Sequence, residues 1–131
     1  MKKLILLFSF LALLFSCSSD NSENNSNNNF TTINPINITS TSFESGGIIT
    51  SNNENYIIGG ICWNTSPNPT ILDNKTINII TNNSFTSVTG PILNPNTVYY
   101  IRAYVQGSTG TLYGNEISIT TNVVPQPVLN P

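Results

Sequence analysis

The sequence predicts an all-β protein, a small seven-stranded β-sandwich, and three observations lead to this prediction. From Ile36 onward, short stretches rich in Ile, Val, Thr and aromatic residues alternate with clusters of Gly, Pro and Asn. No long segment there repeats its apolar residues at the 3.6-residue period of an amphipathic helix. Seven such short stretches fit within residues 36–122, which is typical of a sandwich of two sheets.

The strands are placed by these stretches and by the turn residues between them. Clear turn clusters are Ser66-Pro67-Asn68-Pro69, Asn82-Asn83, Gly90-Pro91 and Gly107-Ser108-Thr109-Gly110. The predicted strands are 36–42, 46–52, 56–64, 76–80, 84–89, 97–106 and 111–121.

The strand 97–106 alternates most regularly and therefore predicts which of its residues face the core. Successive side chains of a strand point to opposite faces of its sheet. The residues expected toward the core are Tyr99, Ile101, Ala103 and Val105, and those expected on the outer face are Tyr100, Arg102 and Tyr104.

The N-terminal segment predicts export. Lys2 and Lys3 precede the apolar stretch 4–15, which is too short to span a bilayer comfortably and is typical of a signal peptide. The stretch Leu14-Phe15-Ser16-Cys17 resembles a bacterial lipobox, with a Phe15 bulkier than the usual residue. The resemblance implies that residues 1–16 are cleaved off and that Cys17 is diacylated on sulfur and acylated on its new amino group. The alternatives are an uncleaved N-terminal anchor helix and an ordinary secretory signal.

Three further segments follow the signal peptide. Residues 17–35 are rich in Ser and Asn and have little to bury, so we expect a disordered tether behind the lipidated Cys17. Residues 36–122 hold the single domain. Residues 123–131 are rich in Pro, which favours an extended, linker-like tail.

The composition argues against several functions. Lys75 and Arg102 are the basic residues outside the signal peptide, against six acidic ones. Nucleic acids and anionic lipids require clustered basic residues, so we expect neither as an electrostatic partner. The chain has no histidine, the usual general base and metal ligand, and its carboxylates are scattered. The sequence therefore predicts no enzyme, no cofactor and no metal. A calcium site at Asp73 and Asn74 beside the loop 67–69 is the weaker alternative.

Three motifs together resemble the fibronectin type III-like domains of Gram-negative cell-envelope lipoproteins, over roughly residues 38–121. They are Leu93-Asn94-Pro95-Asn96-Thr97-Val98-Tyr99, the stretch Gly60 to Thr70 with its Trp63, and Tyr113-Gly114-Asn115-Glu116. The resemblance implies an immunoglobulin/fibronectin type III-like fold in which Tyr99 is a structural tyrosine corner, its hydroxyl bonded to the backbone upstream. Trp63 departs from the family pattern, because it lies on the third predicted strand and not on the second.

Aromatic side chains offer the best candidate binding site. If Trp63 shares the outer face with its neighbours, they form a strip suited to sugars or peptides. The candidate strip consists of Trp63, Tyr100, Arg102, Tyr104 and Tyr113. The alternative is that these residues shield the sheet and that Arg102 stacks on a ring for stability.

Cys62 is the only thiol left once Cys17 is lipidated, so the mature chain has no internal disulfide. Its neighbours are Gly60, Ile61 and Trp63, which predicts a buried, unreactive side chain. A disulfide to another chain is the minor alternative.

These observations predict an outer-membrane lipoprotein, anchored through Cys17 on the periplasmic or the cell-surface face. Its domain is expected to act as a protein-interaction or adhesion module that contacts an envelope protein or a cell-surface glycan. A glycan-binding accessory lipoprotein of an uptake system is the alternative function. The sequence does not identify the ligand.

Overall fold

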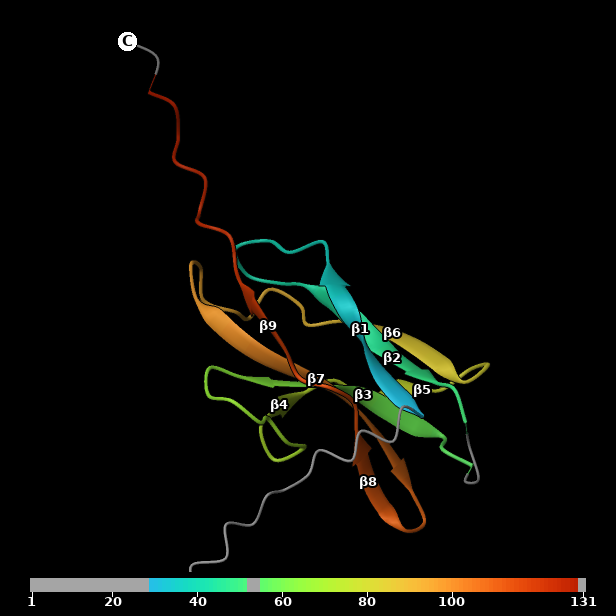
Figure 1. Cartoon of the computed structure of the whole chain (residues 1–131). Coiled ribbons are helices and arrows are strands. Elements are labelled where there is room, and N and C mark those ends of the chain that lie inside the picture. Colours follow the sequence, from blue (N-terminus) through green and yellow to red (C-terminus); the bar gives the residue numbers. More distant parts are fainter. Residues whose placement is uncertain (1–28, 52–54, 130–131) are drawn as a thin grey trace, which may run out of the picture.

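The computed structural model describes residues 29–51 and 55–129, which form two antiparallel β-sheets packed face to face (Figure 1). The predicted signal peptide, Cys17 and most of the predicted tether lie outside the described residues. No helix long and apolar enough to cross a membrane occurs in the described part of the chain. The prediction of an all-β sandwich is confirmed.

The smaller sheet has three strands in the order β1-β2-β6. They are β1 (Phe30–Ile36), β2 (Glu44–Ile49) and β6 (Ser84–Val88). In the register, Gly46 of β2 lies between Ile33 of β1 and Thr86 of β6. This sheet therefore has a glycine, without a side chain, at the middle of one face.

The larger sheet is built around two long strands, β3 (Ile58–Asn64) and β7 (Val98–Gly107), which pair over seven residues. The short strands β4 (Asn74–Lys75) and β5 (Asn78–Ile79) pair with the outer edge of β3. On the other side, β8 (Gly110–Tyr113) and β9 (Ile117–Thr120) pair with β7.

The core lies between the inner faces of the two sheets. The alternation predicted for 97–106 is correct on this side, because Tyr99, Ile101, Ala103 and Val105 are all buried. They pack with side chains from the smaller sheet and from the turns that close the sandwich. The buried cluster also contains Phe30, Phe43, Ile49, Ile61, Trp63, Phe85 and Leu93.

The tyrosine-corner hydrogen bond is present. The Tyr99 hydroxyl accepts a hydrogen bond from the backbone N–H of Asn94, five residues upstream, at 3.0 Å. Tyr99 itself is almost completely buried. The bond fixes the loop before β7 against the strand that this loop enters.

The predicted first strand is wrong. The first strand of the structure is β1, of which residues 30–35 lie in the range 17–35 assigned to the tether, and residues 37–43 form a loop. The strand ends where Asn37 adopts a positive φ of 51°, and the Thr39 side chain then accepts hydrogen bonds from the N–H groups of Thr41 and Ser42. Pro35 is tolerated because β1 is an edge strand.

Two other predicted strands are interrupted. The stretch 76–80 contains only the short β5, with β4 just before Thr76, and the stretch 111–121 is divided into β8 and β9. At Thr76 the backbone C=O accepts from the Tyr104 hydroxyl, while the Thr76 side-chain hydroxyl accepts from the N–H of Ile61. The backbone N–H of Thr76 still donates to the C=O of Ile61 at 2.9 Å, so the side-chain hydroxyl replaces only the backbone C=O in this pairing.

Candidate functional site

The outer face of the larger sheet is where the sequence predicts the aromatic strip. Strand register places Tyr100 beside Asn64 and Ser118, Arg102 beside Cys62, and Tyr104 between Gly60 and Tyr113. Four of the five candidate residues therefore share this face. The fifth, Trp63, does not.

Trp63 lies on the inner face of the sheet. It is opposite the buried Ile101 in the register, and only 3% of its surface is exposed. Its ring meets Phe43 edge to face, with ring centroids 6.3 Å apart and an interplanar angle of 84°. The placement of Trp63 in an exposed strip is therefore wrong, because its position in β3 has the parity of the core.

Tyr104 has the predicted direction but is not accessible. It points to the outer face, yet it is completely buried beneath the chain that leads from β3 to β5. Its hydroxyl donates to the C=O of Thr76 at 2.6 Å, and a Cβ at Gly60 would lie 2.8 Å from its ring. Burial also raises the pKa of the Tyr104 phenol. Tyr104 therefore packs in a small buried cluster on the outer side of the sheet, and it is not available to bind a ligand.

Arg102 and Tyr113 hold each other in place. The guanidinium carbon lies 4.5 Å from the centroid of the Tyr113 ring, and Nε donates to the C=O of Gly114 at 3.2 Å. The Tyr113 hydroxyl accepts from the backbone N–H of Ile71 at 3.1 Å. The pair thus stabilises the crossing loop 65–73, which is the structural alternative foreseen for Arg102. Tyr100, Arg102 and Tyr113 remain partly exposed.

The loop 65–73 is stabilised by its own polar groups. Asp73 accepts from the Asn64 side chain at 2.7 Å and from the N–H of Thr70 at 2.8 Å, so both of its carboxylate oxygens are engaged. These bonds hold the pKa of Asp73 below its ordinary value, and the bond from the Thr70 N–H contributes most. The N–H of Asn68 donates to the Glu116 carboxylate. Within residues 29–51 and 55–129, no cluster of three or more potential metal ligands occurs. Asp73, the carboxylate named in the calcium alternative, thus uses both of its oxygens within its own loop.

Cys62 is buried under the same loop. Its thiol lies 3.5 Å from the C=O of Pro69 and 3.4 Å from that of Arg102. Burial raises the pKa of the Cys62 thiol from 9.0 to about 11. We therefore expect no reaction with a thiol reagent at pH 8 in the native protein and full reaction in denaturant, measured by mass spectrometry. Rapid native labelling would contradict this burial.

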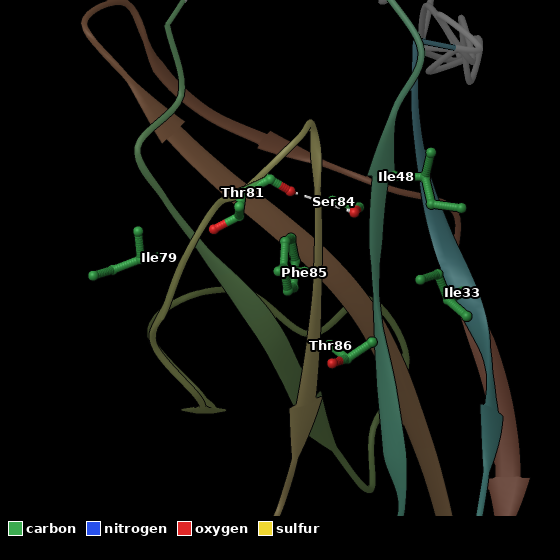
Figure 2. A pocket seen from close by; sticks show the side chains of 7 residues that line it. All are labelled: Ile33, Ile48, Ile79, Thr81, Ser84, Phe85 and Thr86. Atoms are coloured by element: carbon green, nitrogen blue, oxygen red, sulfur yellow. Dashed lines mark hydrogen bonds between the residues drawn. The ribbon is translucent and has the colours of Figure 1, made fainter.

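The structure reveals a groove that sequence reasoning missed, on the outer face of the smaller sheet. It has a volume of about 500 Å³, and Figure 2 shows β6 between Ile33 and Ile48 on one side and Ile79 on the other. Ser84 and Thr86 of β6 also line it. Gly46 of β2 lets the backbone of β6 approach closely beside this groove, because a Cβ at Gly46 would lie 2.0 Å from the C=O oxygen of Phe85.

Exposed isoleucines were the feature from which this groove could have been predicted. Ile48 and Ile79 are 44% and 78% exposed, and none of the lining residues is charged. The parity of Ile33 and Ile48 could have been read from the sequence only with the correct bounds of β1 and β2. The prediction that placed the first strand at 36–42 prevented this.

Known proteins resemble this chain in fold and not in sequence. No family model matches the sequence, and no curated protein matches it. Among solved structures, the fourth fibronectin type III domain of a human protein matches with a TM-score of 0.50 at 16% identity, covering 76% of this chain and 84% of that domain. The sixth such domain of human fibronectin type III domain containing protein 3 has a TM-score of 0.48 at 15% identity, covering 73% and 86%. A myokine structure has a TM-score of 0.49 at 12% identity, covering 70% and 96%.

The topology carries the same conclusion independently of these scores. A three-stranded sheet β1-β2-β6 faces a sheet in which β3 and β7 are central, and Tyr99 forms the corner bond at the start of β7. Two sheets of this kind with a tyrosine corner are typical of immunoglobulin-like sandwiches, the architecture that fibronectin type III domains share. The described domain therefore has a fibronectin type III-like fold.

Proposed function

We propose that this chain is a lipid-anchored lipoprotein of the bacterial outer membrane whose fibronectin type III-like domain acts as a protein-interaction or adhesion module. The lipobox-like stretch that ends at Cys17 supports the anchor. Several acyl chains on one residue are sufficient, because each buried methylene contributes about 0.8 kcal/mol and a single chain binds only reversibly. The domain supplies the interaction.

The observation that carries the interaction role is the uncharged groove of the smaller sheet. Domains of this fold commonly serve as protein-interaction modules. The exposed Ile48 and Ile79 border this groove, and exposed apolar side chains gathered at a surface hollow rimmed by polar groups favour an interaction site. The groove lining is apolar at its sides and carries hydroxyl groups on β6, which suits a partner with both apolar side chains and backbone polar groups.

The anchor is tested by substitution of the acylated residue. In cells that produce the full chain and are fed an alkyne analogue of palmitate, Cys17→Ala should abolish labelling and release the protein from the membrane fraction. Cys62→Ala is the matched control and should keep full labelling, because the thiol of Cys62 is buried. Labelling that persists in Cys17→Ala would refute the lipoprotein assignment. Protease treatment of intact cells would then show which face the domain occupies.

A glycan-binding accessory role in uptake is the second candidate. It is supported by Tyr100, Arg102 and Tyr113, which stay partly exposed on one face of the larger sheet. Tyr100→Ala is the suitable test on a glycan array, because Tyr104→Ala would remove a buried side chain. Sugar binding that is lost in Tyr100→Ala with the fold intact would favour this second function.

A further inference from the structure

We propose that four exposed isoleucines at and beside β5 dock the domain onto the lipid surface of the membrane that anchors it. They are Ile57, Ile58, Ile77 and Ile79, and together they are called the isoleucine patch. The inference rests on the proposed lipid anchor, but it goes beyond the proposed function, which assigns the groove to a protein partner. Ile79 borders both surfaces, and the other three residues do not line the groove.

The chain through β5 has its polar side chains on the inner side and its apolar side chains on the outer side. The Ser87 hydroxyl of β6 forms hydrogen bonds with the Thr76 hydroxyl at 2.6 Å and with the Asn78 side-chain oxygen at 2.8 Å. Alternation then places Ile77 and Ile79 on the outer side, where they are 71% and 78% exposed. Because polar side chains normally take the solvent side of an antiparallel strand, this arrangement favours an apolar environment outside the domain.

The isoleucines form one patch and not four isolated side chains. Ile58 and Ile79 are directly opposite each other in the antiparallel register, so their side chains lie side by side on one face. The N–H of Ile80 donates to the C=O of Ile57 at 3.0 Å, which places Ile57 at the same edge. Ile57 and Ile58 are 67% and 41% exposed. A single exposed isoleucine is ordinary, whereas several at one edge can enter a lipid surface together.

The two stretches that carry the patch contain no acidic residue. In 55–61 and 75–81, Lys75 is the only charged residue, and its ammonium group donates to the C=O of Ile71 at 2.8 Å. Glu54 precedes the first stretch and lies outside the described residues. Lipid headgroup regions carry negative charge, so these stretches can approach such a surface without repulsion from carboxylates. The burial of apolar side chains, and not charge, then drives the docking.

The patch lies at the end of the sandwich where β1 begins. Phe30, the first residue of β1, is opposite Ile49 of β2 in the register. The N–H of Ile49 donates to the C=O of Asn83 at 2.8 Å, and Asn83 belongs to the turn that joins β5 to β6. Neighbouring strands are about 4.8 Å apart. The first residue of the domain is therefore only a few strand spacings from the patch.

The position of Cys17 keeps this end of the domain at the membrane. Cys17 and Asn29 are twelve residues apart, so the domain begins at most about 43 Å from the acylated residue. A connection of this length gives an effective concentration in the millimolar range at the lipid surface. At such a concentration the burial of a few isoleucines is sufficient for docking, although it would be too weak to bring an unanchored domain to the membrane.

The test is fluorescence quenching of the acylated protein in vesicles of phosphatidylethanolamine and phosphatidylglycerol. Ile77→Cys carries a nitrobenzoxadiazole dye, and Cys62 stays unlabelled because it is buried. Ile92→Cys is the matched control: Ile92 is 64% exposed, and the bond from the next residue, Leu93, to the C=O of Thr41 places it at the opposite end of the sandwich. A lipid with a nitroxide on its acyl chain should quench the dye of Ile77→Cys several-fold more than that of Ile92→Cys, and the emission of the former should shift to shorter wavelength.

The possible outcomes separate the anchor from the patch. Equal quenching of the two dyes would overturn the docking. A wavelength shift of Ile77→Cys without quenching by the labelled lipid would indicate contact with another copy of the protein and would overturn it as well. Protein that does not float with the vesicles would refute the lipid anchor, and the inference with it. Flotation is measured on the same samples, so the two failures are distinguished.

A matched pair of substitutions tests the contribution of one isoleucine. With the dye on Ile57→Cys, Ile77→Asn should lower the ratio of docked to undocked domain about tenfold, because the burial of one isoleucine is lost. Ile92→Asn should leave this ratio unchanged. Both side chains are more than half exposed, so neither substitution should affect the fold, which circular dichroism checks. Equal ratios in the two variants would refute the role of the patch.

Discussion

Trp63→Ala should lower the free energy of unfolding by about 3–5 kcal/mol, the usual cost of removing a buried large aromatic side chain. Trp63 belongs to the buried core cluster and is in edge-to-face contact with Phe43, the residue just before β2. A small domain is stable by only about 5 kcal/mol at the low end of the usual range. The variant should therefore be partly or wholly unfolded at room temperature.

Urea denaturation followed by circular dichroism measures this effect. Fluorescence is unsuitable, because Trp63 is the only tryptophan. Trp63→Phe keeps an aromatic ring against Phe43 and should lose clearly less stability. Ile92→Ala, at an exposed position, should change the free energy of unfolding by less than about 0.5 kcal/mol. A Trp63→Ala variant as stable as Ile92→Ala would contradict the placement of Trp63 in the core.

Tyr104→Ala should have the second largest effect, again about 3–5 kcal/mol. The ring fills the space between Gly60 and the chain at Thr76, and the hydroxyl donates to the Thr76 C=O. Its loss should loosen the crossing chain and expose the neighbouring Cys62. In Tyr104→Ala, the free energy of unfolding should therefore fall, and the rate at which a thiol reagent labels Cys62 at pH 8 should rise.

Tyr104→Phe separates the hydroxyl from the ring. It keeps the packing and removes one hydrogen bond, which should cost about 1 kcal/mol because the Thr76 C=O is left without its donor. The thiol of Cys62 should stay protected in this variant. If Tyr104→Ala left both the unfolding transition and the protection of Cys62 unchanged, Tyr104 would not be packed beneath the chain at Thr76, and this interpretation would be disproved.

The sequence predicted the parts of the fold that depend on local alternation. In β7 the core-facing residues Tyr99, Ile101, Ala103 and Val105 follow directly from the two-residue period of a strand. The strand that bears Trp63 was harder to interpret, since Gly59 to Trp63 is buried on both faces. An apolar run of this kind has no polar side to indicate its parity, so the face of Trp63 could not be inferred.

The errors at the N-terminal side have a different cause. Phe30 to Ile36 follows a long run of Asn and Ser and contains Pro35, so its composition resembled the end of a tether. It becomes a strand because Phe30 and Thr32 are buried and because Asn115, far along the chain, accepts from the N–H of Thr32 at 3.0 Å. No local signal reports such a partner.

The sequence by itself determined that this protein is all-β and which residues of β7 face the core, and its resemblance to fibronectin type III-like domains implied the corner bond of Tyr99. The tertiary structure alone decided that Trp63 is internal, that the chain between β3 and β5 covers Tyr104 and Cys62, and that an uncharged groove is open beside β6. The physical reason is that the direction of a side chain within a strand is a local property. Whether that side chain meets solvent depends on which distant segment crosses the face, and only the folded chain specifies this.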